Sequence, residues 1–278
     1  MTMPLVISIQ SQVAYGHVGN SAAAQPMRAA GVEVIEVPTT ILSNHPHYPT
    51  MRGRVLDADF VAEILDGLIE RDQHKRATII LSGFLGKAET AQMVARFVKS
   101  AKQANPNVLY ACDPVMGDTD TGFFVPPALR DAFARDLVPL ADLIFPNTCE
   151  LEFLANMSIH CPKDVGIARA ALGVPAVIAT SVPIPDRADL VATVTADHQS
   201  QSVATAKRLS VRPAGTGDLL AALTVARLAL GVPLADAVAR AVAGVSAILA
   251  RTDPAPWSEM PIAQSLDAIL AAHATNQP

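Results

Sequence analysis

One short stretch of the sequence combines the residue types that phosphoryl transfer needs. Gly215-Thr216-Gly217-Asp218 leads directly into the apolar run 219–223. Glycines let a backbone turn close around an anion, and the first amides of a helix carry unpaired N–H groups and about half a positive charge. Asp218 lies in that first turn, where a carboxylate can accept a proton. The stretch predicts a site for phosphoryl transfer to an alcohol, although a tight turn with a favourable first-turn acid would use the same residues.

Several further polar residues follow predicted strands. In a parallel sheet the carboxyl ends of the strands meet at one edge, where ligands bind. We therefore expect residues from unrelated parts of the chain to converge there with 215–218. The candidates at this edge are Ser11, Ser82-Gly83, Asp113, Asn147, Glu150 and Thr180-Ser181.

Short apolar runs alternate along the chain with helical patterns. We expect strands at 5–9, 32–37, 77–81, 108–112, 143–145 and 176–179, a hairpin of 190–196 with 201–209, and a polar loop or flap at 39–48. Helices are expected at 20–30, 59–71, 88–103, 150–154 and 162–172, and throughout the remainder after the hairpin. This order predicts an α/β fold in one domain, residues 1–278, with a mainly parallel central sheet, helices on both faces and a late β-hairpin.

The composition argues against several other classes of function. The net charge is −5 and the charges are scattered, so nothing predicts a nucleic-acid or membrane partner. The apolar region 219–250 is interrupted by Arg227, Asp236 and Arg240, which favours two buried helices over a membrane span. Three cysteines without ligand spacing, and an N-terminus without a signal pattern, predict a cytoplasmic protein with reduced thiols.

Three partial motifs carry little weight. The pair Gly16 and Gly19 lacks the third glycine of a dinucleotide fingerprint. The stretch 83–87 resembles the end of a P-loop, but Ala88 stands where a magnesium-binding hydroxyl is needed. His45 and His47 lie two residues apart in a loop, which favours solvated histidines over a metal site.

Longer matching segments go further than any of these motifs. Gly-Thr-Gly-Asp at 215–218 is typical of a whole superfamily of sugar and vitamin kinases, whereas the block 9–20 and Ser43-Asn44-His45 are specific to one branch. Over nearly its whole length the chain resembles a pyridoxal kinase of the ribokinase superfamily. The other matching segments are 82–86, 112–118 and 145–150.

The resemblance implies a ribokinase-like sandwich that uses ATP to phosphorylate the 5′-hydroxyl of pyridoxal, pyridoxine or pyridoxamine. It implies that Asp218 is the base and that Gly215, Thr216 and Gly217 form the anion hole. The vitamer would lie against Asp218 and four further residues. These are Ser11, Val18, His45 and Phe84.

The same resemblance assigns a nucleotide side to the site. ATP would be bound by Asp113, Asp118, Glu150, Thr180 and Ser181, and the three carboxylates would hold Mg²⁺ directly or through water. It also implies a monovalent cation such as K⁺ near Asp113, Glu150 and Thr180, and a homodimer. Read without the resemblance, Asp113-Pro114 is a good turn start and Glu150 suits the first turn of a helix capped by Asn147.

The chain departs from the pyridoxal kinase pattern at three positions. Pro46 stands where relatives often have threonine, Phe84 where tyrosine is frequent, and Phe145 where a small or hydroxyl residue is common. Two alternatives therefore stay open. One is a kinase for another heteroaromatic alcohol such as a hydroxymethylpyrimidine, which Ser11 and the Ser43–His45 segment argue against. The other is a low-turnover protein that binds a vitamer or PLP, which Asp218 argues against.

Overall fold

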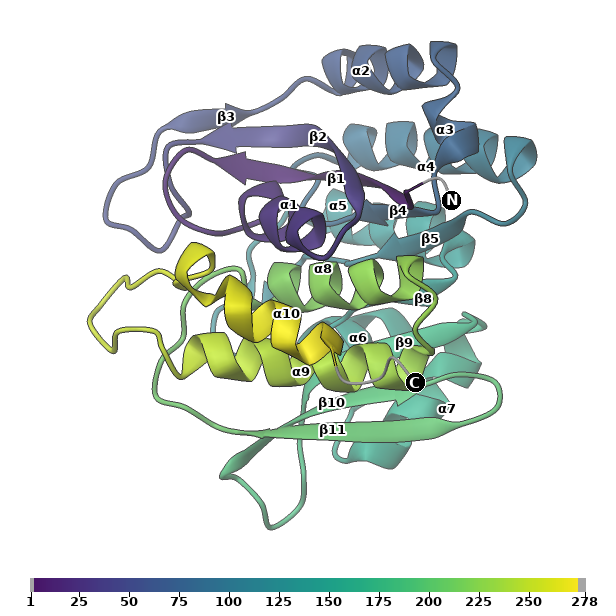
Figure 1. Ribbon diagram of the computed structural model, residues 1–278. Helices are drawn as coiled ribbons and strands as arrows, with labels where there is room; N and C mark the ends of the chain where they lie inside the picture. Colours follow the sequence, from purple (N-terminus) through teal and green to yellow (C-terminus); the bar gives the residue numbers. More distant parts are fainter. Residues whose placement is uncertain (1–2, 275–278) are drawn as a thin grey trace.

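A nine-stranded sheet runs through the computed structural model, which describes residues 3–274 (Figure 1). The strand order is β11-β10-β9-β8-β5-β4-β1-β2-β3. The six strands from β9 to β2 pair in parallel, and β10, β11 and β3 pair antiparallel at the two ends. The strands are β1 (Leu5–Val13), β2 (Glu33–Leu42), β3 (Gly53–Val55), β4 (Ile79–Ser82), β5 (Leu109–Cys112), β8 (Leu143–Ile144), β9 (Ala176–Val182), β10 (Leu190–Ala196) and β11 (Gln201–Lys207), with a separate hairpin of β6 (Gly117–Asp118) and β7 (Gly122–Phe123).

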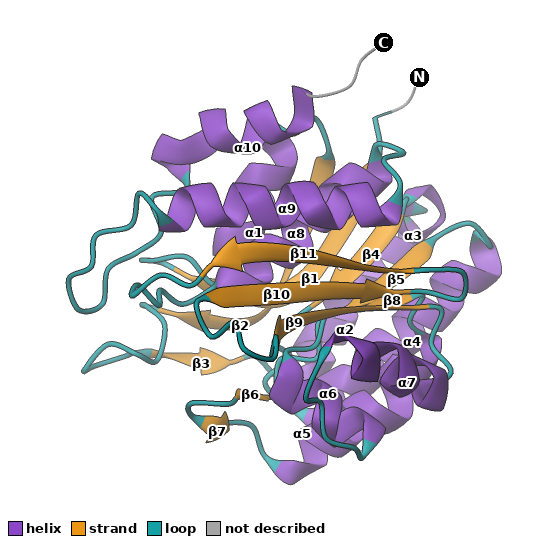
Figure 2. Ribbon diagram, turned by 90° about the horizontal axis from the view of Figure 1, so that it is seen from below, coloured by secondary structure: helices purple, strands orange, loops and turns teal. Residues whose placement is uncertain are grey.

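Helices cover both faces of the sheet, as the turned view shows (Figure 2). One layer consists of α1 (Asn20–Ala29), α8 (Thr216–Ala229), α9 (Leu234–Leu249) and α10 (Leu266–Ala274). The other consists of α2 (Ala58–Glu70), α3 (Gln73–Arg76), α4 (Ala88–Ala104), α5 (Pro127–Ala132), α6 (Thr148–Ala155) and α7 (Pro162–Leu172). Three short segments, η1 (Phe133–Leu137), η2 (Val138–Leu140) and η3 (Ala263–Ser265), complete the elements.

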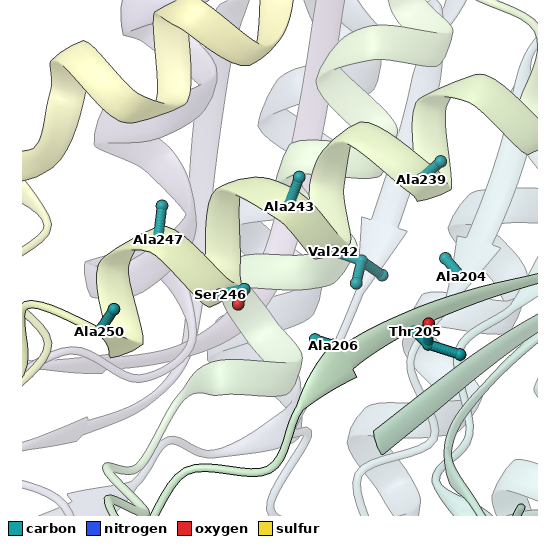
Figure 3. Close-up of a pocket in the computed structure, with 9 residues that line it drawn as sticks. All are labelled: Ala204, Thr205, Ala206, Ala239, Val242, Ala243, Ser246, Ala247 and Ala250. Atoms are coloured by element: carbon teal, nitrogen blue, oxygen red, sulfur yellow. The ribbon is translucent and has the colours of Figure 1, made fainter. Parts of the chain in front are cut away.

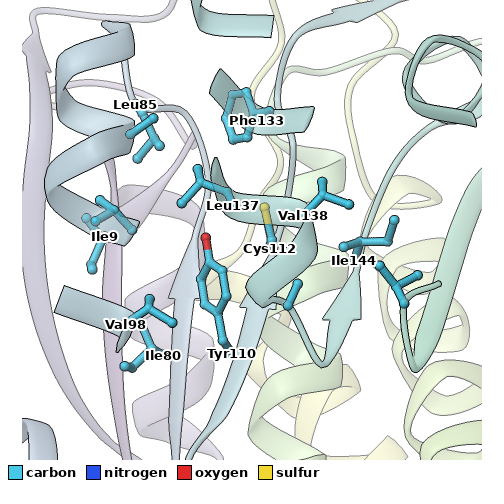
Figure 4. Close-up of a cluster of buried hydrophobic side chains, with 14 of the residues drawn as sticks. Ile9, Ile80, Leu85, Val98, Tyr110, Cys112, Phe133, Leu137, Val138 and Ile144 are labelled. Atoms are coloured by element: carbon cyan, nitrogen blue, oxygen red, sulfur yellow. The ribbon is translucent and has the colours of Figure 1, made fainter. Parts of the chain in front are cut away.

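The sheet separates two buried apolar clusters. Parallel strands are covered on both faces, so their residues form nearly continuous apolar runs, and Leu5 to Ile9 of β1 are all buried. The cluster under α4 contains Ile80, Val98 and Tyr110 (Figure 4). Tyr110 is fully buried, and its hydroxyl lies 2.7 Å from Ser82 Oγ, so the one polar atom of the ring has a partner.

The direction in which successive strands are added to the sheet reverses at β1. From β1 the chain crosses to β2 on one side, and β4 then pairs with the opposite side of β1. In α/β sheets of this kind, ligands bind beyond the carboxyl ends of the strands at such a switch point, because the connections leave in opposite directions. A ligand is therefore expected where β1, β4 and β5 end.

The predicted α/β class, the mainly parallel sheet, the two helical layers and the late hairpin are confirmed. No helix within residues 3–274 is long and apolar enough to cross a membrane. The single domain over 1–278 stays a prediction. Residues 1–2 and 275–278 lie outside the described residues, and the first two belong to the N-terminal sequence that was used to predict a cytoplasmic protein.

Two local predictions were wrong. The predicted flap 39–48 begins in a strand, since residues 39–42 belong to β2 and pair with β3. The remainder after the hairpin is not helical throughout, because an irregular segment at 250–262 separates α9 from α10. Pro254 and Pro256 lack the N–H groups that a helix needs there. The hairpin β6–β7 and helix α5 were not predicted.

Candidate active site

Helix α8 begins at Thr216, directly after a residue that must be glycine. Gly215 has φ of +81°, and a Cβ there would lie 1.8 Å from the carbonyl oxygen of His17. A Cβ on Gly217, by contrast, would meet nothing within 4 Å. The first helix amide with a carbonyl partner is that of Leu219, which donates to Gly215. Within the described residues the amides of Thr216, Gly217 and Asp218 have no carbonyl partner, which is what an anion hole requires.

Asp218 is tied to the loop that follows β1. The N–H of Gly19 donates to Asp218 Oδ2 at 2.9 Å, across 199 residues of sequence. Burial raises the pKa of the Asp218 carboxyl, and the hydrogen bond from Gly19 opposes that shift. A carboxylate with a raised pKa is a better proton acceptor from an alcohol.

Two of the residues expected on the vitamer side, Ser11 and Val18, meet at this loop. A Cβ on Gly19 would lie 2.2 Å from the carbonyl oxygen of Ser11 and 2.5 Å from its Oγ, so the loop passes directly over Ser11. Val18, the residue before Gly19, lies against Gly215. Phe84 is partly buried against the core, and its carbonyl accepts a hydrogen bond from Thr39 at 2.6 Å.

A group of acidic side chains gathers at the ends of β5 and β8. Asp113 and Glu150 are buried, and the pKa of Asp113 is raised well above its usual range by burial and by the charges of Glu150 and Asp218. Burial raises the pKa of Glu150 to about 7, with Asp118 as a further repulsive charge. Within residues 3–274 none of these four carboxylates forms an ion pair with Lys, Arg or His. Such a cluster attracts a cation.

Glu150 also has a structural role. Asn147 caps α6 by accepting the Glu150 N–H at 3.0 Å, and Glu150 Oε2 accepts the Asn147 N–H at 2.9 Å. Glu150 Oε1 accepts the N–H of Met116 at 2.8 Å. The structural alternative for Glu150, a residue in the first turn of a helix capped by Asn147, is therefore present as a capping box. Its oxygens keep lone pairs for a water or an ion.

The carboxylates do not form a ready-made metal cage. No three His, Cys, Asp or Glu side chains in the described part of the chain are placed to hold an ion by themselves. Mg²⁺ usually keeps several waters and takes one or two carboxylates together with phosphate oxygens. The buried, unneutralised Asp113 and Glu150 fit that kind of site, and their role as metal ligands remains a prediction.

Thr180 and Ser181 lie within β9 and not after it. Thr180 forms a β-bridge with Asn147. Thr148 Oγ1 donates to the carbonyls of Thr180 and Ser181. Ser181 is exposed and has φ of +58°, which is unusual for a residue with a side chain. The strand end beside the acidic group therefore adopts a special conformation.

The two loop histidines differ from each other. His47 is exposed as predicted, but His45 is only 2% exposed, so the prediction that both are solvated was wrong for His45. The N–H of Tyr48 points to the carbonyl of His45 at 3.4 Å, closing a turn around Pro46. Proline suits the second position of such a turn, and Pro46 is exposed, so this departure from the family pattern is explained by the turn.

Phe145 packs in the core. It is 4% exposed and belongs to the buried cluster that contains Leu219 and Leu220 of α8. The third departure therefore concerns packing under α8.

Sequence reasoning missed Glu259. Its carboxylate contacts His17, His45 and Tyr48. A cavity of about 240 Å³ beside it is lined by His45, His47, residues 210–214 and residues 252–258. Only the proline-rich stretch 253–256 signalled that the helical pattern breaks there.

A second hollow lies away from these residues, between β11 and α9 (Figure 3). Its walls are small side chains such as Ala206, Ala243 and Ala247. It contains no predicted site residue and no charged group.

A helix start open to an anion, a carboxylate beside it and a buried acidic group at the edge of a parallel sheet are the equipment of phosphoryl transfer. The fold and the site thus define an α/β phosphotransferase for a small molecule.

Comparison with known proteins specifies the class. A family model described as phosphomethylpyrimidine kinase matches residues 19–259. A pyridoxal kinase from Corynebacterium diphtheriae is 38% identical over 272 residues, which cover 95% of each chain. The chain therefore belongs to the phosphomethylpyrimidine kinase family, within which these similar relatives are pyridoxal kinases.

Solved structures agree in fold. Pyridoxal kinase from Entamoeba histolytica matches with a TM-score of 0.90 at 23% identity, covering 99% of this chain and 98% of that one. Pyridoxal kinase from Leishmania donovani in complex with ADP and pyridoxine matches with a TM-score of 0.87 at 25% identity, covering 96% and 95%.

Proposed function

We propose that this chain phosphorylates the 5′-hydroxyl of pyridoxal, and of pyridoxine and pyridoxamine, with ATP. The observation that carries the proposal is the unpaired start of α8 at Gly215–Asp218, with Asp218 bonded to the loop that carries Val18 and passes over Ser11 at Gly19. Membership of the family supports the activity. The complex of the Leishmania enzyme with ADP and pyridoxine supports this pair of ligands.

The residues act as follows in this proposal. Asp218 accepts the proton of the 5′-hydroxyl while the hydroxyl oxygen forms a bond to the γ-phosphorus of ATP. The bond from that phosphorus to the bridging oxygen breaks, and ADP leaves. The amides of Thr216, Gly217 and Asp218 stabilise the charge on the transferring group, since no carbonyl of the described residues occupies them. Gly19 holds Asp218 Oδ2, which leaves Oδ1 for the substrate.

The nucleotide side of the site would be formed by the acidic group and β9. Asp113 and Glu150, with Asp118 through water, would hold Mg²⁺, which neutralises the phosphate oxygens when it is bound. Thr180 and Ser181 would contact the phosphates. The repulsion between Asp113 and Glu150 supports this role, since a cation would relieve it.

The decisive test is Asp218→Asn. The amide keeps the size of the side chain but cannot take the proton, so we expect turnover to fall by about 10²–10⁴ while pyridoxal still binds. ADP release and PLP formation measure turnover, and calorimetry measures the binding of pyridoxal. Near wild-type turnover of the variant would remove Asp218 as the base.

A second candidate is phosphorylation of a hydroxymethylpyrimidine, which the description of the matching family model favours. The B6 vitamers and the pyrimidine alcohol should be compared as substrates in one assay of ADP release. The proposal requires the higher kcat/KM for a vitamer. Tight vitamer binding without turnover would instead indicate a binding protein.

We propose three further properties. A homodimer and dependence on a monovalent cation such as K⁺ near Asp113, Glu150 and Thr180 rest on the family resemblance alone, and a cytoplasmic location rests on the cysteines and the N-terminal sequence. Light scattering tests the first, replacement of K⁺ by Na⁺ in the assay tests the second, and cell fractionation tests the third.

A further inference from the structure

The carboxylate of Glu259 joins three segments that are remote in sequence. Oε2 accepts the backbone N–H of His17 at 2.9 Å, across 242 residues. Oε1 lies 3.0 Å from His45 Nε2 and 2.9 Å from the hydroxyl of Tyr48, across 214 and 211 residues. In Figure 1 the yellow-green loop between α9 and α10 accordingly extends to the side where the loops after β1 and β2 lie. One side chain thus connects the C-terminal segment to both loops.

The approach of Glu259 depends on a glycine. Gly16 has φ of +93°, and a Cβ there would lie 2.4 Å from Glu259 Oε1. The glycine pair that makes a weak dinucleotide motif therefore has another explanation. Gly16 makes room for Glu259, and Gly19 makes room for Ser11.

Both ends of the short loop around Val18 are held by carboxylates. Glu259 accepts the N–H of His17, and Asp218 accepts the N–H of Gly19. Val18 lies between the two fixed amides, where the vitamer ring is expected. The position of Val18 therefore depends on Glu259 as well as on the base.

The flap is fixed by the other oxygen of the same carboxylate. His45 Nδ1 accepts the N–H of His47 at 3.3 Å, so the ring proton is on Nε2 and is donated to Glu259. The rings of His45 and Tyr48 pack with centroids 4.6 Å apart, and Tyr48 also bonds to the carbonyl of Trp257 at 2.9 Å. Burial lowers the pKa of His45, which favours this neutral form.

We propose that Glu259 is a positioning residue for the vitamer pocket, which ties the loop that carries Val18 to the flap that carries His45. The inference rests on the proposed kinase function. It predicts that Glu259 controls the binding of the vitamer and leaves the nucleotide side unaffected, because its partners all belong to the loops after β1 and β2.

The test is Glu259→Gln, assayed with pyridoxal and ATP varied separately. The amide has one oxygen, so its NH₂ group must face either the His17 N–H or the flap donors. We expect KM for pyridoxal to rise by about tenfold, the scale of one lost charge-assisted hydrogen bond, with KM for ATP changed by less than about twofold. Asp267→Asn is the matched control. It breaks an exposed ion pair with Arg251 in the same C-terminal region, so both constants should stay unchanged.

Tyr48→Phe is the second variant and removes a single donor. We expect a rise of about threefold in KM for pyridoxal, and an effect that adds only in part to that of Glu259→Gln. Both changes break the Tyr48–Glu259 contact, and only Tyr48→Phe also removes the bond to the carbonyl of Trp257. If Glu259→Gln does not fold, Tyr48→Phe decides the question by the same measurement.

The outcomes separate the two proposals. A wild-type protein that makes no PLP contradicts the proposed function itself. An active wild type whose variants keep the KM for pyridoxal overturns the role of Glu259. Equal rises in both KM values with a lower melting temperature also overturn it, because they indicate a general loss of structure.

Discussion

Two glycines in one motif have different physical roles. Gly215 is required by the fold, because its φ is positive and a side chain would collide with the backbone of His17. Gly217 is not required by packing, since the space beside it is open. In the proposed mechanism this space admits the phosphoryl group. The proposal thus assigns a structural role to Gly215 and a functional role to Gly217.

Replacing each glycine by alanine tests this separation. Gly215→Ala should destabilise the protein by at least about 1–2 kcal/mol, from the left-handed conformation alone. Gly217→Ala should keep or raise the stability, by up to about 1 kcal/mol in a helix, but lower kcat/KM for ATP by about tenfold or more. Thermal unfolding and initial rates measure the two effects. A fully active Gly217→Ala variant would show that no phosphate uses this space.

The same contrast between fold and function recurs at the start of α6. Asn147 caps the helix, and its Nδ2 donates to the carbonyl of Gly117 in β6 at 2.7 Å. Glu150 Oε1 holds the same hairpin through the N–H of Met116. Helix α6 therefore positions the hairpin that carries Asp118. In the proposed site, the nucleotide side depends on this junction.

Asn147→Ala should remove both the cap and the bond to Gly117, and we expect a loss of about 1–2 kcal/mol in the free energy of unfolding. It should also raise the Mg²⁺ concentration needed for half-maximal activity, because Glu150 loses its fixed position. Denaturant unfolding and a Mg²⁺ titration measure these effects. Asn147→Ser is the control that keeps the capping oxygen but not the donor to Gly117. An unchanged Mg²⁺ requirement in both variants would contradict the prediction that the start of α6 positions Glu150 for Mg²⁺ binding.

At the scale of the whole molecule, the acidic group makes the free energy of unfolding depend on pH when no cation is bound. The folded Glu150 has a pKa of about 7 against 4.5 for an unperturbed carboxyl. Between these values the folded state holds more protons than the unfolded state, so the free energy of unfolding falls as the pH rises. The lowered pKa of His45 acts in the opposite direction below its ordinary value of 6.5. The site is thus partly strained at neutral pH without a cation.

Asp118→Asn tests the repulsive part of this effect. Without the charge of Asp118, Glu150 ionises more easily, so the fall in the free energy of unfolding between pH 5 and pH 7 should be smaller, by up to about 1 kcal/mol, and the variant should be more stable at pH 7. It should also lose activity at ordinary Mg²⁺ concentrations. Denaturant unfolding at both pH values is the measurement. If the free energy of unfolding depends on pH identically in the variant and the wild type, the predicted interaction between the two carboxylates is wrong.

The sequence by itself determined the elements and the chemistry of the motif. Apolar periodicity placed the parallel strands and both helical layers, because burial on two faces leaves a local pattern. The turn at 215–218 was also readable, since glycine conformation and helix starts are local properties. The irregular segment 250–262 was not, although its prolines mark a break.

Only the tertiary structure decided which polar groups meet. The pairs Gly19–Asp218 and His45–Glu259 are separated by 199 and 214 residues. No local periodicity encodes such a contact, because it arises when the sheet order brings loop ends together and glycines at 16, 19 and 215 allow backbones to approach. The raised pKa values of Asp113 and Glu150 have the same origin, since burial and like charge exist only after packing.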